Sequence, residues 1–346
     1  MSRKHITIYD IAREAEVSPA TVSRILNGSS RVKEENRRRV NALIEKYNFR
    51  PNAMARALSD TRSKLIGMVL ADANNPYYSS LFSACVIEAY RRGYGVMMFN
   101  TLSRPEMEDA ALERLREQRA DAVIISGGRV DLTVEDEGFA ASLRTAAENM
   151  NVVLASRSKD PSIHGIEVAH AHSVDLAMDY LLELGHRDIG FIYTGEQFYG
   201  TAEKLERFRK RMAQAGLKVN EQWMINVKEY NCESGHEGVD RLMQLKERPT
   251  ALLGLNDMIT AGALQGLLDH GVRVPEEISL MGFDDTFITS ITSPKLTSVH
   301  YDYDEYARML VDAATGPLEE KEIPWNQTLQ CRLLKRRSCC GPAPKA

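Results

Sequence analysis

The chain lacks several features that would place it in a large class of proteins. No apolar run approaches the roughly 18 residues that a membrane-spanning helix needs. No segment with a charged start and an apolar centre precedes the first predicted helix, so no export signal is expected. Cysteines are few, odd in number and irregularly spaced, which predicts neither a disulfide framework nor a zinc site: Cys85, Cys232, Cys331, Cys339 and Cys340. Together these absences predict a protein of a reducing cytoplasm without membrane contact.

Motifs of common enzymes are also missing. The sequence contains no Gly-x-Gly-x-x-Gly between a strand and a helix, no Walker loop, no Gly-x-Ser-x-Gly and no His-Glu-x-x-His. Asp284 and Asp285 form a carboxylate pair, but adjacent residues at a strand end point apart. We therefore expect no enzyme, no cofactor and no bound metal. An α/β enzyme acting on sugars or nucleotides remains an alternative, as does an exported solute-binding protein; an activity screen and cell fractionation would test them.

Charge is distributed unevenly along the chain. Residues 1–64 carry 14 lysines and arginines against 7 acidic residues, whereas the whole chain carries 44 against 48. A near-neutral total therefore hides a basic head on an acidic body. This asymmetry is expected when one domain faces the phosphates of nucleic acid.

Residues 7–47 predict three short helices. Thr7 is a candidate N-cap for a helix that begins at Ile8, and a second helix is predicted with Ser18 as its cap and Pro19 in its first position. Two short helices joined by a tight turn make a helix-turn-helix, which needs a third helix to bury its apolar faces. Residues 34–47 supply that helix.

The second of these helices has the side chains to read DNA. Small residues that allow a close approach to base edges are Pro19, Ala20, Thr21 and Ser23, and Arg24 has the planar fork that recognises guanine. The competing interpretation is an unrelated bundle of three helices with a solvated basic face. Helix caps, turn chemistry and charge all favour the first interpretation.

Beyond residue 64, apolar strands alternate with amphipathic helices. Strands are predicted at 65–70, 96–99, 122–125, 152–155, 165–168, 189–193, 223–227, 251–255 and 278–283, and helices at 76–92, 106–118, 142–149, 174–184, 202–215, 233–244 and 259–270. This order predicts an α/β body of two doubly wound, parallel-sheet lobes. Ligands bind such sheets at the carboxyl ends of the strands, so a cleft between the lobes is expected. The last residues, 339–346, are predicted to be disordered; a redox pair formed by Cys339 and Cys340 is the alternative.

Three stretches resemble the LacI/GalR family of bacterial transcriptional repressors: YDIAREAEVSPATVSRILNGSSRV, then RPNAMARAL, then GFDD at 282–285. The resemblance implies a DNA-binding head at 1–50, and a hinge helix with its linker at 51–61. The resemblance further implies that this helix folds only on operator DNA, and that Leu58 would wedge into the minor groove and kink the duplex. The DNA-binding residues expected on these grounds are Thr7, Ser18, Pro19, Ala20, Thr21, Ser23, Arg24, Asn27, Asn52, Ala53, Arg56 and Leu58. One departure is Lys33, which stands where the family usually has a Ser or Thr cap.

The same resemblance implies a body like that of periplasmic binding proteins, whose chain crosses between lobes three times. We expect the crossings near Asp160, Phe287 and Glu319. The first lobe would then comprise 62–160 with 288–319, and the second 161–287 with 320–338.

Effector-binding residues are expected after the strands, in positions that match ligand contacts of the family: Tyr77, Tyr78, Arg157, Phe198, Lys204, Tyr230, Asn256 and Asp284. Core packing is the alternative for each aromatic residue, and a cap at a strand end for each polar one. Lys204 replaces an arginine with which many relatives grip the effector by a bidentate fork. Residues 168–173 also depart from the usual pattern, so no effector identity is transferred from a relative.

The sequence thus predicts a repressor that binds a palindromic operator as a homodimer. A small molecule, a sugar or related metabolite, would control it by changing the arrangement of the two lobes. The direction of that control, the operator sequence and any pairing of dimers remain open.

Overall fold

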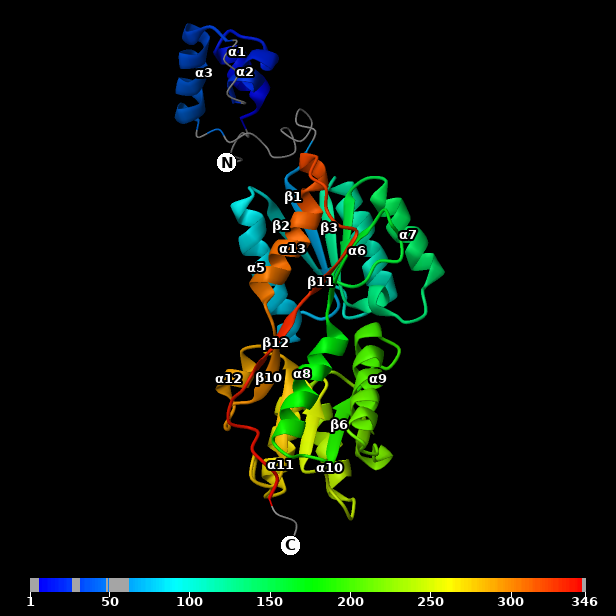
Figure 1. Ribbon diagram of the computed structural model, residues 1–346. Helices are drawn as coiled ribbons and strands as arrows, with labels where there is room; N and C mark the ends of the chain where they lie inside the picture. The colour runs from blue at the N-terminus through cyan, green and yellow to red at the C-terminus, as the bar shows by residue number, and fades with distance from the viewer. Residues whose placement is uncertain (1–5, 27–31, 48, 50–61, 344–346) are drawn as a thin grey trace. The chain divides into compact units, whose positions relative to one another are not determined.

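The computed structural model describes residues 6–26, 32–47, 49 and 62–343 (Figure 1). The chain forms two compact units, Met1–Ser63 and Lys64–Ala346. Each is described by itself. Within the described residues no helix is long and apolar enough to cross a membrane.

The first unit is a bundle of three helices, α1 (Ile8–Glu14), α2 (Pro19–Leu26) and α3 (Glu34–Lys46). The predicted caps are confirmed. The Thr7 side chain accepts from the backbone N–H of Asp10, whose carboxylate accepts from the Thr7 N–H at 3.0 Å. The Ser18 hydroxyl accepts from the N–H of Thr21 at 3.2 Å. As expected from its sequence, Lys33 provides no side-chain cap for α3.

One small core holds these helices together. Ile11, Val22 and Val40, one from each helix, are fully buried against each other. At the edge, the Glu14 carboxylate accepts hydrogen bonds from Lys46 at 2.7 Å and from the Tyr47 hydroxyl at 2.8 Å. The third helix thus covers the apolar faces that the first two cannot bury alone.

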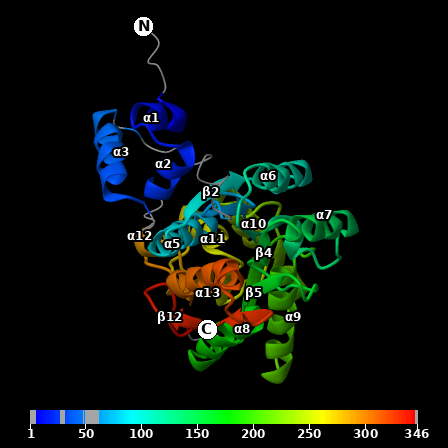
Figure 2. The same ribbon diagram turned by 90° about the horizontal axis from the view of Figure 1, so that it is seen from above.

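The second unit consists of two α/β lobes (Figures 1 and 2). The first lobe is built on a parallel sheet in the order β11-β5-β4-β3-β1-β2. Its strands are β1 (Leu65–Leu70), β2 (Gly95–Asn100), β3 (Ala122–Ser126), β4 (Asn151–Leu154), β5 (His164–Val168) and β11 (Asn326–Leu329). Helices α5 (Pro76–Arg91) and α13 (Tyr303–Thr315) cover one face, and α6 (Pro105–Glu117) and α7 (Glu137–Ala147) cover the other.

The second lobe repeats this plan with the sheet order β12-β10-β9-β8-β6-β7. Its strands are β6 (Ile189–Tyr193), β7 (Met224–Asn226), β8 (Ala251–Gly254), β9 (Ser279–Asp284), β10 (Thr297–Tyr301) and the antiparallel edge strand β12 (Cys331–Leu334). Its helices are α8 (His170–Glu183), α9 (Tyr199–Gln214), α10 (Cys232–Met243), α11 (Asp257–Asp269) and the short α12 (Ile288–Ile291). The predicted pair of doubly wound lobes is confirmed.

The three crossings lie later in the chain than the sequence predicted. The expected crossing near Asp160 is wrong because β5, which follows it, still pairs with β4 and β11 of the first sheet. The one near Phe287 is wrong because β10 pairs with β9 of the second sheet, so only α13 returns to the first lobe. The one near Glu319 is wrong because β11 belongs to the first sheet. The crossings are at 169, 302 and 330, each directly after a strand.

The predicted disorder of the tail is also wrong for residues 339–343. Ser338 is fully buried, its carbonyl accepts from the Leu280 N–H at 2.7 Å, and its hydroxyl accepts from the Thr297 N–H at 2.8 Å. His186 contacts the Cys340 carbonyl through Nε2 at 2.8 Å. These hydrogen bonds fasten the segment around Ser338 along β9. Cys339 and Cys340 are free thiols.

Candidate functional site

Helix α2 presents one exposed face. Val22 and Ile25 point into the core of the head, whereas Pro19, Ala20 and Arg24 are exposed. Ser18 is also exposed, and its hydroxyl lies 2.9 Å from that of Thr21, which with Ser23 is partly exposed. Thr7 is exposed at the start of α1. The expected DNA-binding residues Asn27, Asn52, Ala53, Arg56 and Leu58 lie outside the described residues.

A small, exposed surface beside a fork-shaped cation suits the major groove. Arg24 forms no ion pair with any of the described residues, so its guanidinium is available to a base or a phosphate. Tyr9 is a neighbouring aromatic side chain that the sequence reasoning missed; it lies 70% exposed on α1. Its exposure could not be read from the helical pattern, which placed it only between two apolar positions.

The second candidate site is a cavity of about 540 Å³ in the body. Its lining comes from both lobes and from the carboxyl ends of β1, β3, β5, β6, β8, β9 and β10. This is the edge at which parallel sheets bind ligands. Seven of the eight expected effector residues line it: Tyr77, Tyr78, Phe198, Lys204, Tyr230, Asn256 and Asp284.

Lys204 is the buried cation of this cavity. Its side chain projects from α9, is only 5% exposed, and donates to the Leu255 carbonyl at 3.3 Å. The ammonium lies 4.4 Å from the centre of the Phe283 ring. Burial lowers the pKa of Lys204, and the Asp284 carboxylate opposes that shift. An ammonium with one carbonyl partner keeps two N–H donors for a ligand.

Asp284 is the matching buried anion. It ends β9, is 7% exposed, and has a φ of 99°, which non-glycine residues rarely adopt. Burial raises its pKa well above the usual range, while Lys204 acts in the opposite direction. The backbone of Asp284 is held in place by the Tyr303 hydroxyl, which donates to its carbonyl at 3.2 Å. The strained strand end is therefore fixed by its surroundings.

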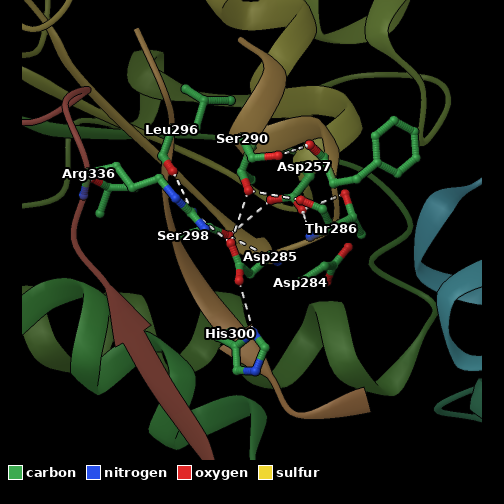
Figure 3. Close-up of polar contacts among 12 residues, drawn as sticks. Asp257, Asp284, Asp285, Thr286, Ser290, Leu296, Ser298, His300 and Arg336 are labelled. Atoms are coloured by element: carbon green, nitrogen blue, oxygen red, sulfur yellow. Dashed lines mark hydrogen bonds and ion pairs between the residues drawn. The ribbon is translucent and has the colours of Figure 1, made fainter. Parts of the chain in front are cut away.

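A polar network behind Asp284 provides that support (Figure 3). Asp285 contacts His300 Nδ1 at 2.9 Å and the Arg336 guanidinium at 2.6 Å. Burial raises the pKa of Asp285, but its hydrogen bonds with His300 and Arg336 outweigh burial and hold that pKa below its ordinary value. Asp257 accepts from the hydroxyls of Thr286 at 2.8 Å and Ser298 at 3.0 Å.

Aromatic rings form the walls. Tyr77 and Tyr78 begin α5 and meet edge to face, 5.0 Å apart. Opposite them, Phe198 and Tyr230 lie 6.3 Å apart at a tilt. Gly195 makes room for Tyr230, since a Cβ there would lie 1.9 Å from the tyrosine oxygen. Flat, partly polar walls of this kind suit a ring with hydroxyl groups.

Asn256 and Arg157 are already engaged within the protein. The Asn256 amide oxygen caps α11 by accepting from the Ile259 N–H at 2.8 Å, as in the alternative interpretation, although the residue also lines the cavity. Arg157 does not line the cavity. Its guanidinium donates to Glu167 at 2.9 Å and lies 4.9 Å from the centre of the Tyr199 ring. Arg157 therefore contacts two residues that do line the cavity, Glu167 and Tyr199.

The sequence reasoning missed further lining residues. Glu167 and Tyr301 lie near the ends of β5 and β10, and the others lie in segments that follow strands: Asp131, His170 and Tyr199. The strand that ends at Tyr301 was not predicted from the sequence, whereas His170 lies two residues after a structural strand that the sequence did predict, at 165–168. Burial raises the pKa of Asp131 to about 6. Among the described residues no group of three metal-ligating side chains is present.

A head with an exposed recognition helix, and a body of two lobes around a polar cavity, define the class of ligand-responsive DNA-binding regulators. Residues 7–52 match the family described as bacterial regulatory proteins, lacI family, and residues 178–339 match the periplasmic binding protein-like domain. Catabolite control protein A of Priestia megaterium is 30% identical, over 85% of this chain and 87% of its own. The transcriptional repressor PurR of Haemophilus influenzae strain PittEE is 31% identical, over 91% and 92%.

A solved structure of the Lac repressor dimer, bound to operator and the anti-inducer ONPF, superposes with a TM-score of 0.86 at 26% identity. It covers 97% of this chain and 100% of its own. The chain belongs to the LacI family of bacterial regulatory proteins and is a DNA-binding transcriptional regulator.

Proposed function

We propose that this regulator is a cytoplasmic repressor that binds a palindromic operator as a homodimer and responds to an uncharged sugar or related metabolite. The head would read one half-site through Arg24 and the small residues of α2, and a two-fold axis would place a second head on the other half-site. The residues expected in the hinge, 51–61, would link the head to the body.

The observation that carries the proposal is the composition of the cavity. Its described lining includes five carboxylates, one buried ammonium and no arginine. The carboxylates are Asp72, Asp131, Glu167, Glu229 and Asp284. Carboxylates accept hydrogen bonds from hydroxyl groups but repel phosphate and carboxylate ligands. Aromatic walls beside acidic acceptors therefore favour an uncharged, hydroxylated ring.

Control would follow from the position of the cavity between the lobes. A ligand that contacts Lys204 and Asp284 of the second lobe, and Tyr77 of the first, binds one lobe arrangement more tightly than another. Only such a difference in affinity can shift the equilibrium. The sign of the response, release or recruitment, depends on which arrangement holds the heads at the operator spacing.

The test is operator binding by the full chain with defined metabolites. A palindromic duplex would first be selected from a library. Fluorescence anisotropy would then be measured with D-glucose, D-galactose, D-ribose and cellobiose, and with the matching sugar phosphates. At least one uncharged sugar should shift the midpoint while its phosphate does not. A response to phosphates alone would overturn the proposed effector class.

A further inference from the structure

Two polar atoms in the lining of the cavity have no hydrogen-bond partner among the residues that the structure describes. They are Oε2 of Glu167 and Nδ1 of His170, and both atoms are buried. The Tyr301 hydroxyl also lines the cavity, and a hydrogen bond with the Ser173 side chain opposes the rise that burial causes in its pKa. Buried polar groups are nearly always paired, and an unpaired one costs free energy. Two of them in the lining of one cavity indicate a ligand that binds there.

Glu167 is held so that only one of its oxygens is used. The Arg157 guanidinium donates to Oε1 through Nη2 at 2.9 Å and through Nε at 3.2 Å. Both bonds end on the same oxygen, although an arginine fork can reach both. The second oxygen therefore remains an acceptor, and the Tyr199 ring packed on Arg157 keeps the guanidinium from shifting.

His170, three residues further along the chain, is an uncharged residue of the same cavity lining. Burial and the nearby Lys204 ammonium lower the pKa of His170 to about 3. A neutral imidazole has one nitrogen that accepts and one that donates. The ring is packed closely against Gly200, where a Cβ would lie 2.8 Å from Nε2, so it cannot move toward α9.

These groups lie at the crossings between the lobes. Glu167 and His170 flank Ala169 at the first crossing, and Tyr301 ends the strand before the second. The first crossing is fastened to the third by two bonds, from the Ala169 N–H to the Leu329 carbonyl at 3.0 Å and from the Cys331 thiol to the Ala169 carbonyl at 3.6 Å. A ligand here touches the segments on which the lobes turn.

We propose that Glu167 and His170 form a subsite that hydrogen-bonds to hydroxyl groups of the uncharged sugar, and that this subsite determines which sugar is recognised. Tyr301 lies beside it as a donor or acceptor. The inference rests on the proposed function for the ligand class but assigns specificity to residues that the sequence reasoning did not select.

The experiment uses the full chain and isothermal titration calorimetry. D-glucose, D-galactose, D-ribose and cellobiose are titrated first, and the tightest of them is then compared with its single-deoxy analogues. The variants are Glu167→Gln and His170→Phe. The control is His172→Phe, an exposed residue of the same helix that does not line the cavity.

One deoxy analogue should bind the parent about tenfold to a hundredfold more weakly than the intact sugar, because a hydrogen bond to a charged or buried partner is lost. Removal of the same hydroxyl group from the sugar should reduce the affinity of Glu167→Gln or His170→Phe only slightly. In His172→Phe it should reduce the affinity as much as in the parent. If each deoxy analogue loses the same affinity in the variants as in the parent, the subsite is refuted, while the proposed response to a sugar stands.

If none of these sugars binds the parent, the proposed effector class fails, and the subsite is judged by the stability of the unliganded proteins. His170→Phe removes an unpaired polar atom, so its urea midpoint should equal or exceed that of the parent. A midpoint clearly below those of the parent and His172→Phe would mean that His170 is paired within the protein, and would overturn the subsite.

Discussion

Arg336 forms an ion pair with Asp285 at 2.6 Å, and neither side chain is more than 21% exposed. The pair connects the segment after the third crossing to the strand end that carries Asp284. Since Asp285 has a φ of 53° and Asp284 one of 99°, the ion pair also holds a strained turn at the cavity. The same buried cluster therefore stabilises the body and positions Asp284 at the cavity.

Arg336→Met should destabilise the body by about 3 to 5 kcal/mol, because it leaves the Asp285 carboxylate buried with less compensation. Urea unfolding of the full chain measures this change. Arg273→Met is the matched control, since its pair with Glu277 is 69% and 43% exposed and contributes roughly 0–1 kcal/mol. Equal losses in the two variants would show that the Asp285 pair is solvated.

Asp284→Asn should remove the effector response while leaving operator binding intact. The substitution keeps the shape of the side chain but removes the carboxylate that opposes the lowering of the Lys204 pKa. It also removes the strongest acceptor for hydroxyl groups in the second lobe. Sugar-dependent release or recruitment should require at least about tenfold more ligand. Glu237→Gln, at an exposed residue that does not line the cavity, is the control. An unchanged response in Asp284→Asn would remove Asp284 from the site.

Arg24→Ala should weaken binding to the cognate operator by about 1–3 kcal/mol and binding to random DNA by much less. The reason is that a guanidinium fork in the major groove reads a base, whereas phosphate contacts are the same on any duplex. Anisotropy titrations with both duplexes at equal salt give the comparison, with Arg13→Ala on α1 as the control. If the losses match on both duplexes, Arg24 touches only phosphate.

The stability of the body should carry an acid-sensitive contribution from His186. Burial lowers the pKa of this residue below its ordinary value of 6.5, so the folded state holds it neutral while the unfolded chain takes up a proton first. Its contribution is therefore present above pH 6.5 and is lost as the pH falls, by up to about 1.4 kcal/mol per pH unit. Unfolding free energies between neutral and mildly acidic pH would show it.

The matched variant is His186→Gln, which cannot be protonated in this range. Its stability should be lower than that of the parent at neutral pH, because the contact with the Cys340 carbonyl is altered. Its pH slope should lack the histidine contribution. Parallel slopes in the two proteins would mean that His186 titrates normally in the folded state.

Local signals in the sequence were sufficient for the head. The capping pair of Thr7 and Asp10, and Ser18 before Pro19, depend only on residues three or four positions apart, and the structure has both. The same holds for the strands β1 to β9 of the body, whereas β10 and β11 were not predicted. Tyr77 and Asp284 were selected because they match ligand contacts of the family that the sequence resembles, near the ends of strands that the pattern identifies.

The errors concern contacts between distant segments. A strand such as β5 has the same apolar pattern whichever sheet it joins, so its assignment to the first lobe could not be read locally. The segment at Cys339 has a composition typical of a loose tail, but its order comes from bonds to β9, nearly sixty residues earlier in the chain.

The most direct test of the account is selective operator binding by the full chain at moderate salt. Parent protein is titrated against a library of palindromic duplexes and against bulk DNA, with and without the uncharged sugars. The account predicts one family of palindromes bound at least about a thousandfold more tightly than bulk DNA, with an affinity that a sugar changes. Equal affinity for every duplex, unchanged by any sugar, would contradict it.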